Sequence, residues 1–550
     1  MSTSSRFIRG EIGKNNPLFS MARVTIETAF YGNNVIPVFS PSEAYKLAKD
    51  SPGTIVTDLH VFKPEKVGLE CDSRVLLFND GAVTGRCATA RRILGEPGVD
   101  EAEYGAKIRE AIYNTRSRKM YHAQAYIGLD ENFMVKAHLL VPETHENLIY
   151  NWLLNFQPIN EFYNGMYETS ERFEGEGDIF VFSDPEWQHP DHPLGLSFFD
   201  PEHNCAAILG MRYFGEFKKG TLTLAWGCAN RRGFAACHGG QKRYNLQDRK
   251  FVVGFFGLSG SGKSTLTHAK HGGKYDVTVL HDDAFVISSS DGSSVALEPS
   301  YFDKTSDYPL SSEDNKYLLS VQNVGATQDD EGRIVIVTED IRNGNGRAIK
   351  SKLWSPNRVD RFDEPVDSIV WLMKDPSIPP VVRVVDPVLA STMGATLATK
   401  RTSAERLAPG VDPNALVIEP YANPFRTYPL SADFDRYLEL FTSRSIDCYI
   451  FNTGYFRDVK VPKDLTLQIL ELIVERRAEF VPWGPFTELE TMEIKGFIPD
   501  LTDESYKKLV RDRLVDRLSF LRSREIERGG FDKLPAEAAE SIYSLVERLR

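Results

Sequence analysis

At 550 residues, the chain is long enough for two to four domains, and we expect two large ones. Hydrophobic residues make up 41% and charged residues 26% of the sequence, as in ordinary globular proteins, so disorder over most of the chain is not expected. The formal net charge of −12 argues against nucleic acid as a partner, because binding to its phosphate backbone depends on a basic face.

The N-terminal sequence MSTSSRFIRGEIGKNNPLF lacks the apolar core of a signal peptide. No window approaches the roughly 20 apolar residues that a membrane span needs. The six cysteines form no C-x-x-C pair and no zinc-type spacing, which suits a reducing compartment. We therefore expect a cytoplasmic protein without a membrane partner. Most cysteines should be buried, and Cys87 and Cys237 are the exceptions to consider because they adjoin predicted site residues.

Apolar periodicity predicts a mixed α/β chain. Apolar positions three or four residues apart predict helices at 100–116 and 142–156. Short segments rich in β-branched and aromatic residues, bounded by turn formers, predict strands. The predicted strands are residues 74–79, 178–184, 206–213, 221–226, 250–257, 277–283, 333–337 and 368–373.

The polar, glycine-containing segment 237–250 predicts a domain boundary near residue 240. We expect an N-terminal substrate-binding α/β domain over 1–240 and a nucleotide-binding domain with a helical tail over 241–550. The tail carries leucines at helical spacing among many charged residues, which favours a helix packed on the body of the protein. These leucines are Leu509, Leu514, Leu518 and Leu521.

Residues 257–264 fit the phosphate-binding pattern G-x-x-x-x-G-K-[ST], after an apolar strand and before a segment that can be helical. The glycines let backbone N–H groups point at a phosphate, and the helix terminus favours anions. Lys263 would reach the β- and γ-phosphates, and the Ser264 hydroxyl would bind Mg²⁺. A chance match would require strand, spacing, lysine and hydroxyl to coincide. The predicted nucleotide-binding residues are Gly257, Leu258, Ser259, Gly260, Ser261, Gly262, Lys263, Ser264 and Thr265.

Two carboxylates, Asp282 and Asp283, end the next predicted strand. Placed beside a phosphate loop, they can hold a metal directly and through water, in an arrangement that resembles a Walker B segment. A solvated turn is the alternative reading, and the loop upstream disfavours it. The sequence therefore predicts binding of a nucleoside triphosphate with a divalent metal, and it leaves the acceptor open, since this loop occurs in ATPases, GTPases and kinases.

About 250 residues precede the phosphate loop, and we expect this half to build the substrate site. The chain resembles phosphoenolpyruvate carboxykinases of the ATP-dependent type, as a divergent member, in a series of motifs. These motifs are YFGEFKKG at 213–220, His238, FFGLSGSGKSTL, the Asp pair at 282–283 and NGR at 345–347. Further matches are TGR at 84–86, EPSYFDKT from Glu298, PPVVR at 379–383 and CYIFNTGY at 448–455. GLSGSGK preceded by GEFKKG is the specific combination, and the three-residue motifs are weak by themselves.

The resemblance implies a two-domain carboxykinase-like α/β fold with a P-loop nucleotide-binding domain, and ATP, Mn²⁺ and Mg²⁺ as nucleotide and metals. Lys219, His238 and Asp283 would hold the Mn²⁺, with Asp282 behind them, and Ser264 would hold the Mg²⁺. A lysine ligand must be unprotonated, so its pKa must be lowered by the metal and by burial.

The resemblance also implies the substrate-side residues. Arg86 and Tyr213 would hold the oxaloacetate carboxylate and the departing CO₂. Arg347 would bridge the substrate and the γ-phosphate, and Lys263 with Lys304 would neutralise the transferring phosphoryl group. The implied reaction converts oxaloacetate and ATP into phosphoenolpyruvate, ADP and CO₂. Decarboxylation leaves an enolate, which needs a Lewis acid at its oxygen before phosphoryl transfer.

The chain departs from the family at the edges of both pockets. CATARR follows Arg86, AFVI follows the Asp pair, AIKSK follows Arg347, and GYFRDVKVPKDLT occupies 454–466, where Arg457 or Lys460 could replace missing basic residues. These departures allow an altered nucleotide preference, or a carboxykinase-like kinase with another small-molecule or protein acceptor. A nucleotide-binding regulatory protein without catalysis is a third alternative, and the intact Lys263, Asp283 and His238 argue against it. A polar run at 398–415 predicts a lid. We expect a monomer or small homo-oligomer acting on small molecules.

Overall fold

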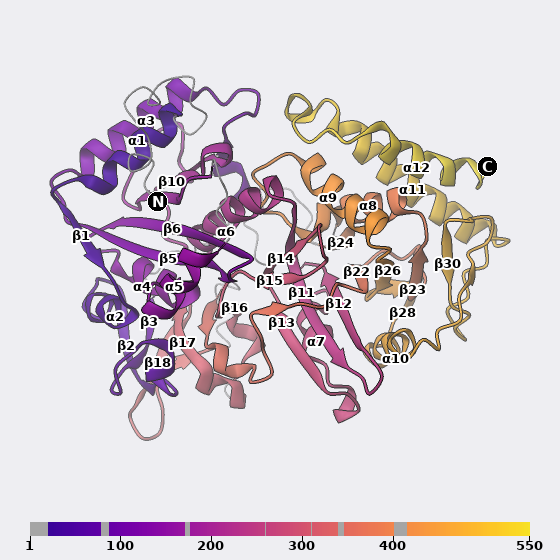
Figure 1. Ribbon diagram of the computed structural model, residues 1–550, viewed down its shortest axis with the longest axis horizontal. Coiled ribbons are helices and arrows are strands. Elements are labelled where there is room, and N and C mark those ends of the chain that lie inside the picture. The colour runs from indigo at the N-terminus through magenta and orange to yellow at the C-terminus, as the bar shows by residue number, and fades with distance from the viewer. Residues whose placement is uncertain are drawn as a thin grey trace. The chain divides into compact units, whose positions relative to one another are not determined.

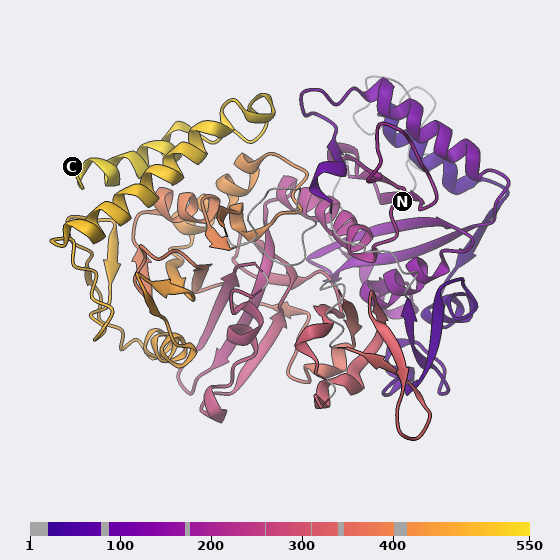
Figure 2. The same cartoon turned by 180° about the vertical axis from the view of Figure 1, so that it is seen from behind.

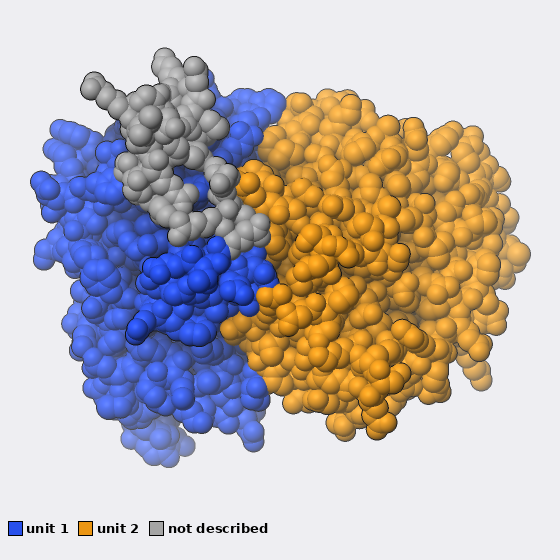
Figure 3. Space-filling view, viewed as in Figure 1, with its two compact units in different colours: residues 1–228, 297–356, 403–406 blue, residues 229–296, 357–402, 407–550 orange. Residues whose placement is uncertain are grey.

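The computed structural model describes residues 20–78, 87–170, 176–258, 260–309, 311–338, 346–400 and 415–550 (Figure 1). The chain divides into two compact units, drawn in blue and orange in Figure 3. Unit 1 comprises residues 1–228, 297–356 and 403–406, and unit 2 comprises 229–296, 357–402 and 407–550. A segment that follows the phosphate loop in the sequence, 297–356, therefore belongs to the unit built mainly by the N-terminal part.

Unit 1 contains an eight-stranded sheet in the order β1-β5-β6-β8-β10-β9-β4, with β7 beside β5. Helices α1 (Met21–Thr28) and α3 (Glu101–Thr115) lie side by side against β8 and β10 (Figures 1 and 2). The α3 helix confirms the prediction at 100–116. The strands are β1 (Val35–Val38), β4 (Arg91–Ile93), β5 (Met120–Asp130), β6 (Phe133–Pro142), β7 (Gln157–Pro158), β8 (Ile179–Asp184), β9 (Leu196–Asp200) and β10 (Cys205–Leu209).

A second sheet of unit 1 has the order β16-β20-β17-β3-β2, and a separate hairpin joins β18 to β19. Its strands come from two of the unit's sequence segments, 1–228 and 297–356, so distant residues become neighbours. The strands are β2 (Thr54–His60), β3 (Arg74–Phe78), β16 (Tyr301–Lys304), β17 (Leu318–Gln322), β18 (Gly325–Gln328), β19 (Ile334–Val337) and β20 (Arg347–Lys350). The other helices are α2 (Pro41–Ala48), α4 (Glu146–Asn155), α5 (Glu161–Thr169) and α6 (Phe214–Arg231).

The strand predicted at 221–226 is wrong, because these residues form the middle of α6. The side chains of Leu222, Leu224 and Trp226 are all fully buried. A helix buried on every side shows no polar stripe, so its sequence lacks the period that would separate it from a buried strand.

Unit 2 contains an eleven-stranded sheet in the order β21-β15-β14-β11-β12-β22-β26-β23-β30-β29, with β13 beside β11. At its centre β12, β22 and β26 are parallel, so their carboxyl ends share one edge. The strands are β11 (Phe234–Asn245), β12 (Lys250–Phe256), β13 (Val277–His281), β14 (Ala284–Ser288), β15 (Ser294–Ala296), β21 (Arg361–Phe362), β22 (Ser368–Met373), β23 (Val381–Val384), β26 (Asp447–Asn452), β29 (Val481–Pro482) and β30 (Leu489–Thr491).

The segment 237–250, expected to connect two domains, lies mostly within β11. Two further hairpins pair β24 (Ala398–Lys400) with β25 (Leu416–Ile418) and β27 (Tyr455–Phe456) with β28 (Val459–Lys460). The helices of unit 2 are α7 (Lys263–His268), α8 (Pro387–Ala395), α9 (Leu430–Ser443), α10 (Lys463–Val474), α11 (Glu504–Arg524) and α12 (Ala536–Glu547).

The predicted tail helix is confirmed as α11, which lies alongside α12 (Figures 1 and 2). Leu514, Leu518 and Leu521 are buried, and Leu509 is half-buried. In the described parts of the chain, no helix combines the length and the apolar character needed to cross a membrane.

Candidate active site

The phosphate loop connects β12 to α7, which is the strand–loop–helix context that the motif requires. Gly260 and Gly262 have φ angles of +79° and +92°, a backbone conformation that glycine adopts without strain. A Cβ on Gly257 would lie 2.8 Å from the Cβ of Leu372, so glycine allows the loop to pack closely on β22. The motif glycines are therefore required by the loop's shape.

The first turn of α7 presents Ser264 and Thr265 as exposed residues, while Ser261 is buried. The predicted Mg²⁺ ligand Ser264 is thus accessible to a bound nucleotide. Ser259 lies outside the described residues.

His238 and Asp283 form the centre of the predicted metal site in unit 2. His238 lies on β11, and its Nε2 is 3.0 Å from Oδ1 of Asp283, just beyond β13. The His238 Nδ1 donates a hydrogen bond to the carbonyl oxygen of Ala422. With Nδ1 bonded to a backbone carbonyl, Nε2 is the ring nitrogen that faces the Asp283 carboxylate, and a backbone-held Nδ1 is the usual orientation of a metal-binding histidine. Lys263 Nζ lies 3.8 Å from the same Asp283 oxygen.

Asp282 is buried behind this pair. Burial alone would raise the pKa of its carboxyl, but a 3.2 Å contact with Nε2 of His268 and nearby positive charge hold that pKa well below its usual range. The backbone N–H of Asp283 donates to Nδ1 of His281, which fixes the turn between the two carboxylates. Both aspartates are therefore presented in one defined turn next to the phosphate loop.

In unit 1, the adjacent lysines 218 and 219 are both buried, so they do not form a solvated surface pair. Lys218 pairs with Glu298 at 3.0 Å, and both side chains have no exposed surface. Asn155 donates to the other Glu298 oxygen at 2.6 Å. Lys218 is thus a structural ion-pair partner, whereas Lys219, 7% exposed, is the one predicted as a metal ligand.

Tyr213 precedes α6 and is buried. A Cβ on Gly215 would lie 2.4 Å from the Tyr213 ring, so this glycine makes room for the ring over the start of the helix. Packing alone therefore explains why residue 215 of the YFGEFKKG motif is a glycine, independently of the resemblance to a family.

Lys304 and Arg347 lie directly opposite each other in the antiparallel pairing of β16 with β20. Arg347 is 5% exposed. Like charges directly opposite each other across a ladder are unfavourable, and such arrangements are concentrated at functional sites. The register therefore joins the two residues predicted to handle the phosphoryl group, although 43 positions separate them (347 minus 304).

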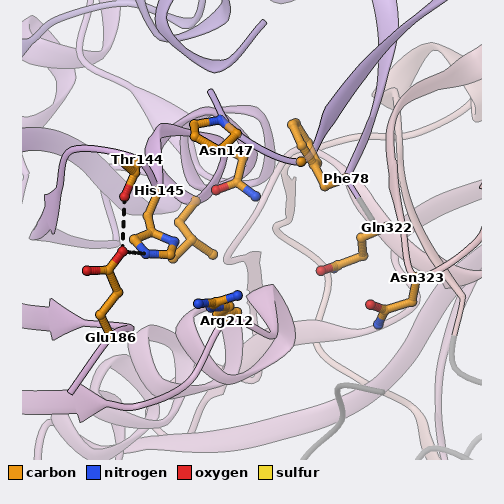
Figure 4. Close-up of a pocket in the computed structure, with 11 residues that line it drawn as sticks. Phe78, Thr144, His145, Asn147, Glu186, Arg212, Gln322 and Asn323 are labelled. Carbon is orange, nitrogen blue, oxygen red and sulfur yellow. Dashed lines mark hydrogen bonds and ion pairs between the residues drawn. The ribbon is translucent and has the colours of Figure 1, made fainter. Parts of the chain in front are cut away.

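Unit 1 also holds a pocket of about 470 Å³ (Figure 4). One of its residues, Arg212, is the neighbour of Tyr213, and another, Gln322, pairs with Arg347 in the sheet. The pocket therefore adjoins Tyr213 and Arg347, two of the predicted site residues. It is lined by Pro52, Gly53, Phe78, Thr144, His145, Asn147, Leu148, Glu186, Arg212, Gln322 and Asn323.

The polar lining of this pocket suits a carboxylate. The negative charge of Glu186 is already balanced by Arg118 at 3.0 Å, and His145 contacts Glu186 at 3.3 Å. Burial lowers the pKa of His145, and the charge of Arg212 lowers it further, against the effect of Glu186. Figure 4 shows the amides of Gln322 and Asn323 on the side opposite the His145–Glu186 contact. Arg212 with neutral hydrogen-bonding groups can receive a small anion.

Sequence reasoning did not find His145, Arg212, Gln322 or Asn323. They come from separate segments without a spacing signal, and only the position of Arg212 next to Tyr213 could have drawn attention to it. The predicted substrate residue Arg86 lies outside the described residues, as does 401–414, most of the predicted lid.

Arg457, a proposed replacement for missing nucleotide-side residues, forms an ion pair with Asp503 of the tail at 2.8 Å. Lys460 is exposed on β28.

All six cysteines are free thiols, and five are buried, which confirms that most are buried but not that Cys87 and Cys237 are exceptions. Cys87 and Cys237 are among the buried ones, and burial raises the pKa of the Cys237 thiol. A thiol in that state is a poor nucleophile. Cys71 is exposed.

A phosphate loop after the central strand of a sheet, followed by a strand that ends in two aspartates, defines the class as a P-loop nucleotide-binding α/β protein. The sequence matches the profile of the family described as "Phosphoenolpyruvate carboxykinase" over residues 60–479, and the chain belongs to this family.

Among curated relatives, "Phosphoenolpyruvate carboxykinase (ATP)" of Aeropyrum pernix is 29% identical over 338 residues, which cover 58% of this chain and 67% of that relative. The proteins of the same name from Dictyostelium discoideum and Eremothecium gossypii are 27% and 29% identical. Those alignments cover 35% and 36% of this chain and 36% and 38% of the relatives, well under two thirds of their length.

Proposed function

We propose that this protein converts oxaloacetate and ATP into phosphoenolpyruvate, ADP and CO₂. The observation that carries the proposal is the position of Asp283. One carboxylate oxygen lies 3.0 Å from His238 Nε2 and 3.8 Å from the phosphate-loop Lys263 Nζ. His238, which would bind the metal that activates the acceptor, and Lys263, which would hold the phosphates of the donor, thus both contact the side chain of Asp283. The relatives' names and the family match support the same reaction.

The residues in unit 2 fit the proposed Mn²⁺. The His238 tautomer is fixed by Ala422, and Nε2 and the Asp283 carboxylate converge. Among the described residues, no third histidine, cysteine, aspartate or glutamate joins them, and Lys219 is the further ligand that we propose. A Mn²⁺ bound there would supply Lewis acidity for the enolate oxygen. Ser264 would hold the nucleotide's Mg²⁺.

The proposed roles of unit 1 follow from its charges. Tyr213 and Arg86 would orient the oxaloacetate carboxylate, and the pocket that contains Arg212 lies next to Tyr213. Lys304 and Arg347 would balance the charge of the phosphoryl group as it moves from ATP to the enolate oxygen, since phosphoryl transfer depends mainly on positioning and charge neutralisation.

The proposal includes a cytoplasmic location and a monomer or small homo-oligomer that acts on small molecules.

The proposal is tested by replacing Lys263, His238 and Asp283 with alanine, one at a time, and following phosphoenolpyruvate formation. Each variant should remain folded and lose turnover. Turnover near the wild-type rate in any folded variant would refute the assignment. ATP consumption that does not require oxaloacetate would instead support a kinase with another acceptor.

A further inference from the structure

The tail helix α11 lies beyond the family match, which ends at residue 479, yet it inserts a charged side chain into the interior of unit 2. Arg517 is 3% exposed and pairs with the 1% exposed side chain of Asp375 at 3.0 Å. It also donates to the carbonyl oxygen of Thr396. A buried ion pair is costly to desolvate and is weak evidence for stability, so we consider the geometry that this pair imposes.

The place where Arg517 acts is next to the phosphate loop. Asp375 lies just beyond β22, which runs parallel to β12, the strand that leads into that loop. Leu372 of β22 is the residue against which Gly257 packs. In open parallel sheets, ligands bind outside the carboxyl ends of the strands. The segment held by Arg517 therefore follows the strand adjacent to the phosphate-binding strand, at the edge where the nucleotide is expected.

The segment after the next parallel strand, β26, is joined to the same body. The Asn452 side chain donates to the carbonyl oxygens of Asp375 and Ile378 at 3.0 and 2.6 Å. The Arg457 N–H donates to the carbonyl oxygen of Pro376 at 2.8 Å. These bonds tie 374–378 to 452–457, so a shift of one segment moves the other.

The tail holds both segments. The Tyr506 hydroxyl donates to the carbonyl oxygen of Ser377 at 2.8 Å. Asp503 pairs with Arg457 at 2.8 Å, and the Tyr506 ring packs edge-on against Phe456 at 5.4 Å. Three positions along α11 and its N-cap thus contact the two segments that follow β22 and β26, and none of these contacts is with the predicted phosphate-binding residues themselves.

We propose that α11 positions the nucleotide-binding edge of unit 2, with Arg517 and Tyr506 as positioning residues that hold the segments after β22 and β26 in the conformation that binds ATP. This inference rests on the proposed function only in placing the nucleotide at the phosphate loop. It assigns the tail a role in nucleotide affinity rather than in the acceptor site.

The test measures ATP–Mg²⁺ affinity directly, by equilibrium titration of the full-length protein without oxaloacetate, for Tyr506→Phe and Arg517→Met. Lys508→Ala is the matched control, because Lys508 lies on the same helix in an exposed ion pair with Asp512. Tyr506→Phe should weaken ATP binding about 3- to 10-fold, the effect of one lost hydrogen bond. Arg517→Met should weaken it more, and the control should be unchanged.

The KM for oxaloacetate should stay within about twofold of wild type in every variant, which a general loss of structure would not allow. If Arg517→Met does not fold, the ATP affinities of Tyr506→Phe and Asp503→Asn test the inference instead. Wild-type affinity for ATP in the folded variants would overturn the inference, as would absence of ATP binding by the wild type. ATP binding without phosphoenolpyruvate formation would contradict the proposed reaction and leave this test valid.

Discussion

Lys304 and Arg347 are direct partners across the antiparallel ladder of β16 and β20, so two cationic side chains leave the sheet at facing positions. Charge pairs of this kind oppose folding and are found where an anion is to be bound. Arg347→Gln should therefore lower kcat by roughly 100-fold or more, the typical effect of removing one charge-stabilising donor. The melting temperature should stay the same or rise.

The matched control for that prediction is Arg333→Gln, since Arg333 is exposed on the β18–β19 hairpin and pairs with Asp329. Steady-state kinetics and thermal melting of both variants check it. A marked drop in melting temperature of Arg347→Gln with kcat retained would show that Arg347 has a structural role.

The neighbouring lysines of α6 should behave differently. Lys218→Met leaves the Glu298 carboxylate buried without its cation, and the cost of such a change is about 3–5 kcal/mol of unfolding free energy. Lys219→Met should remove activity, because Lys219 is a proposed metal ligand. Urea unfolding and turnover of the two variants check the contrast, and restored stability in Lys218→Met/Glu298→Leu would confirm that the loss comes from the unpaired charge.

His238 and Asp283 should determine Mn²⁺ affinity. His238→Ala and Asp283→Asn should each weaken Mn²⁺ binding by about 100-fold or more, because each removes a proposed ligand. Titration monitored by the Mn²⁺ paramagnetic resonance signal measures this without turnover. His189→Ala serves as the control, because His189 is far from these residues in the sequence and belongs to unit 1. If His238→Ala, Asp283→Asn and His189→Ala all bound Mn²⁺ with equal affinity, the proposed site would be excluded.

Lys242 makes stability depend on pH. Burial lowers its pKa from 10.5 to about 7, while its ammonium donates to the carbonyl oxygen of Ala269 at 3.0 Å. Between these two pKa values the unfolded chain binds more protons, so this group's destabilising effect is largest at and below pH 7 and declines as the pH rises toward 10.5. Lys242→Met should therefore stabilise the protein more at pH 7 than at pH 9.5, by about 3 kcal/mol.

Urea unfolding of wild type and Lys242→Met at the two pH values measures the difference. If Lys242→Met raised the free energy of unfolding by the same amount at both pH values, the pKa of Lys242 in the folded protein would be close to its pKa in the unfolded chain.

Much of unit 2 could be predicted from local sequence. The β12 and β13 strands, the loop between β12 and α7, and the aspartates after β13 all follow from a short contiguous motif with strong glycine and hydrophobic signals. The α6 helix could not, because Leu222, Leu224 and Trp226 are buried on every side and erase the helical period.

Contacts between residues far apart in the chain could not be predicted from the sequence either. Lys304 and Arg347 were both predicted as site residues, but their register depends on how two distant segments align in one sheet. The pocket lined by His145, Arg212 and Gln322 depends in the same way on tertiary structure. The contacts of Arg517 with Asp375 were missed because a buried arginine in a charged helix has the same local signal as an exposed one.

The central claim is tested most directly by measuring phosphoenolpyruvate formation from oxaloacetate and ATP with Mn²⁺ and Mg²⁺, in parallel with GTP and with the His238→Ala variant. The account predicts ATP-supported, oxaloacetate-dependent formation of phosphoenolpyruvate by the wild type and none by the variant. Wild-type protein that binds ATP and makes no phosphoenolpyruvate would contradict it.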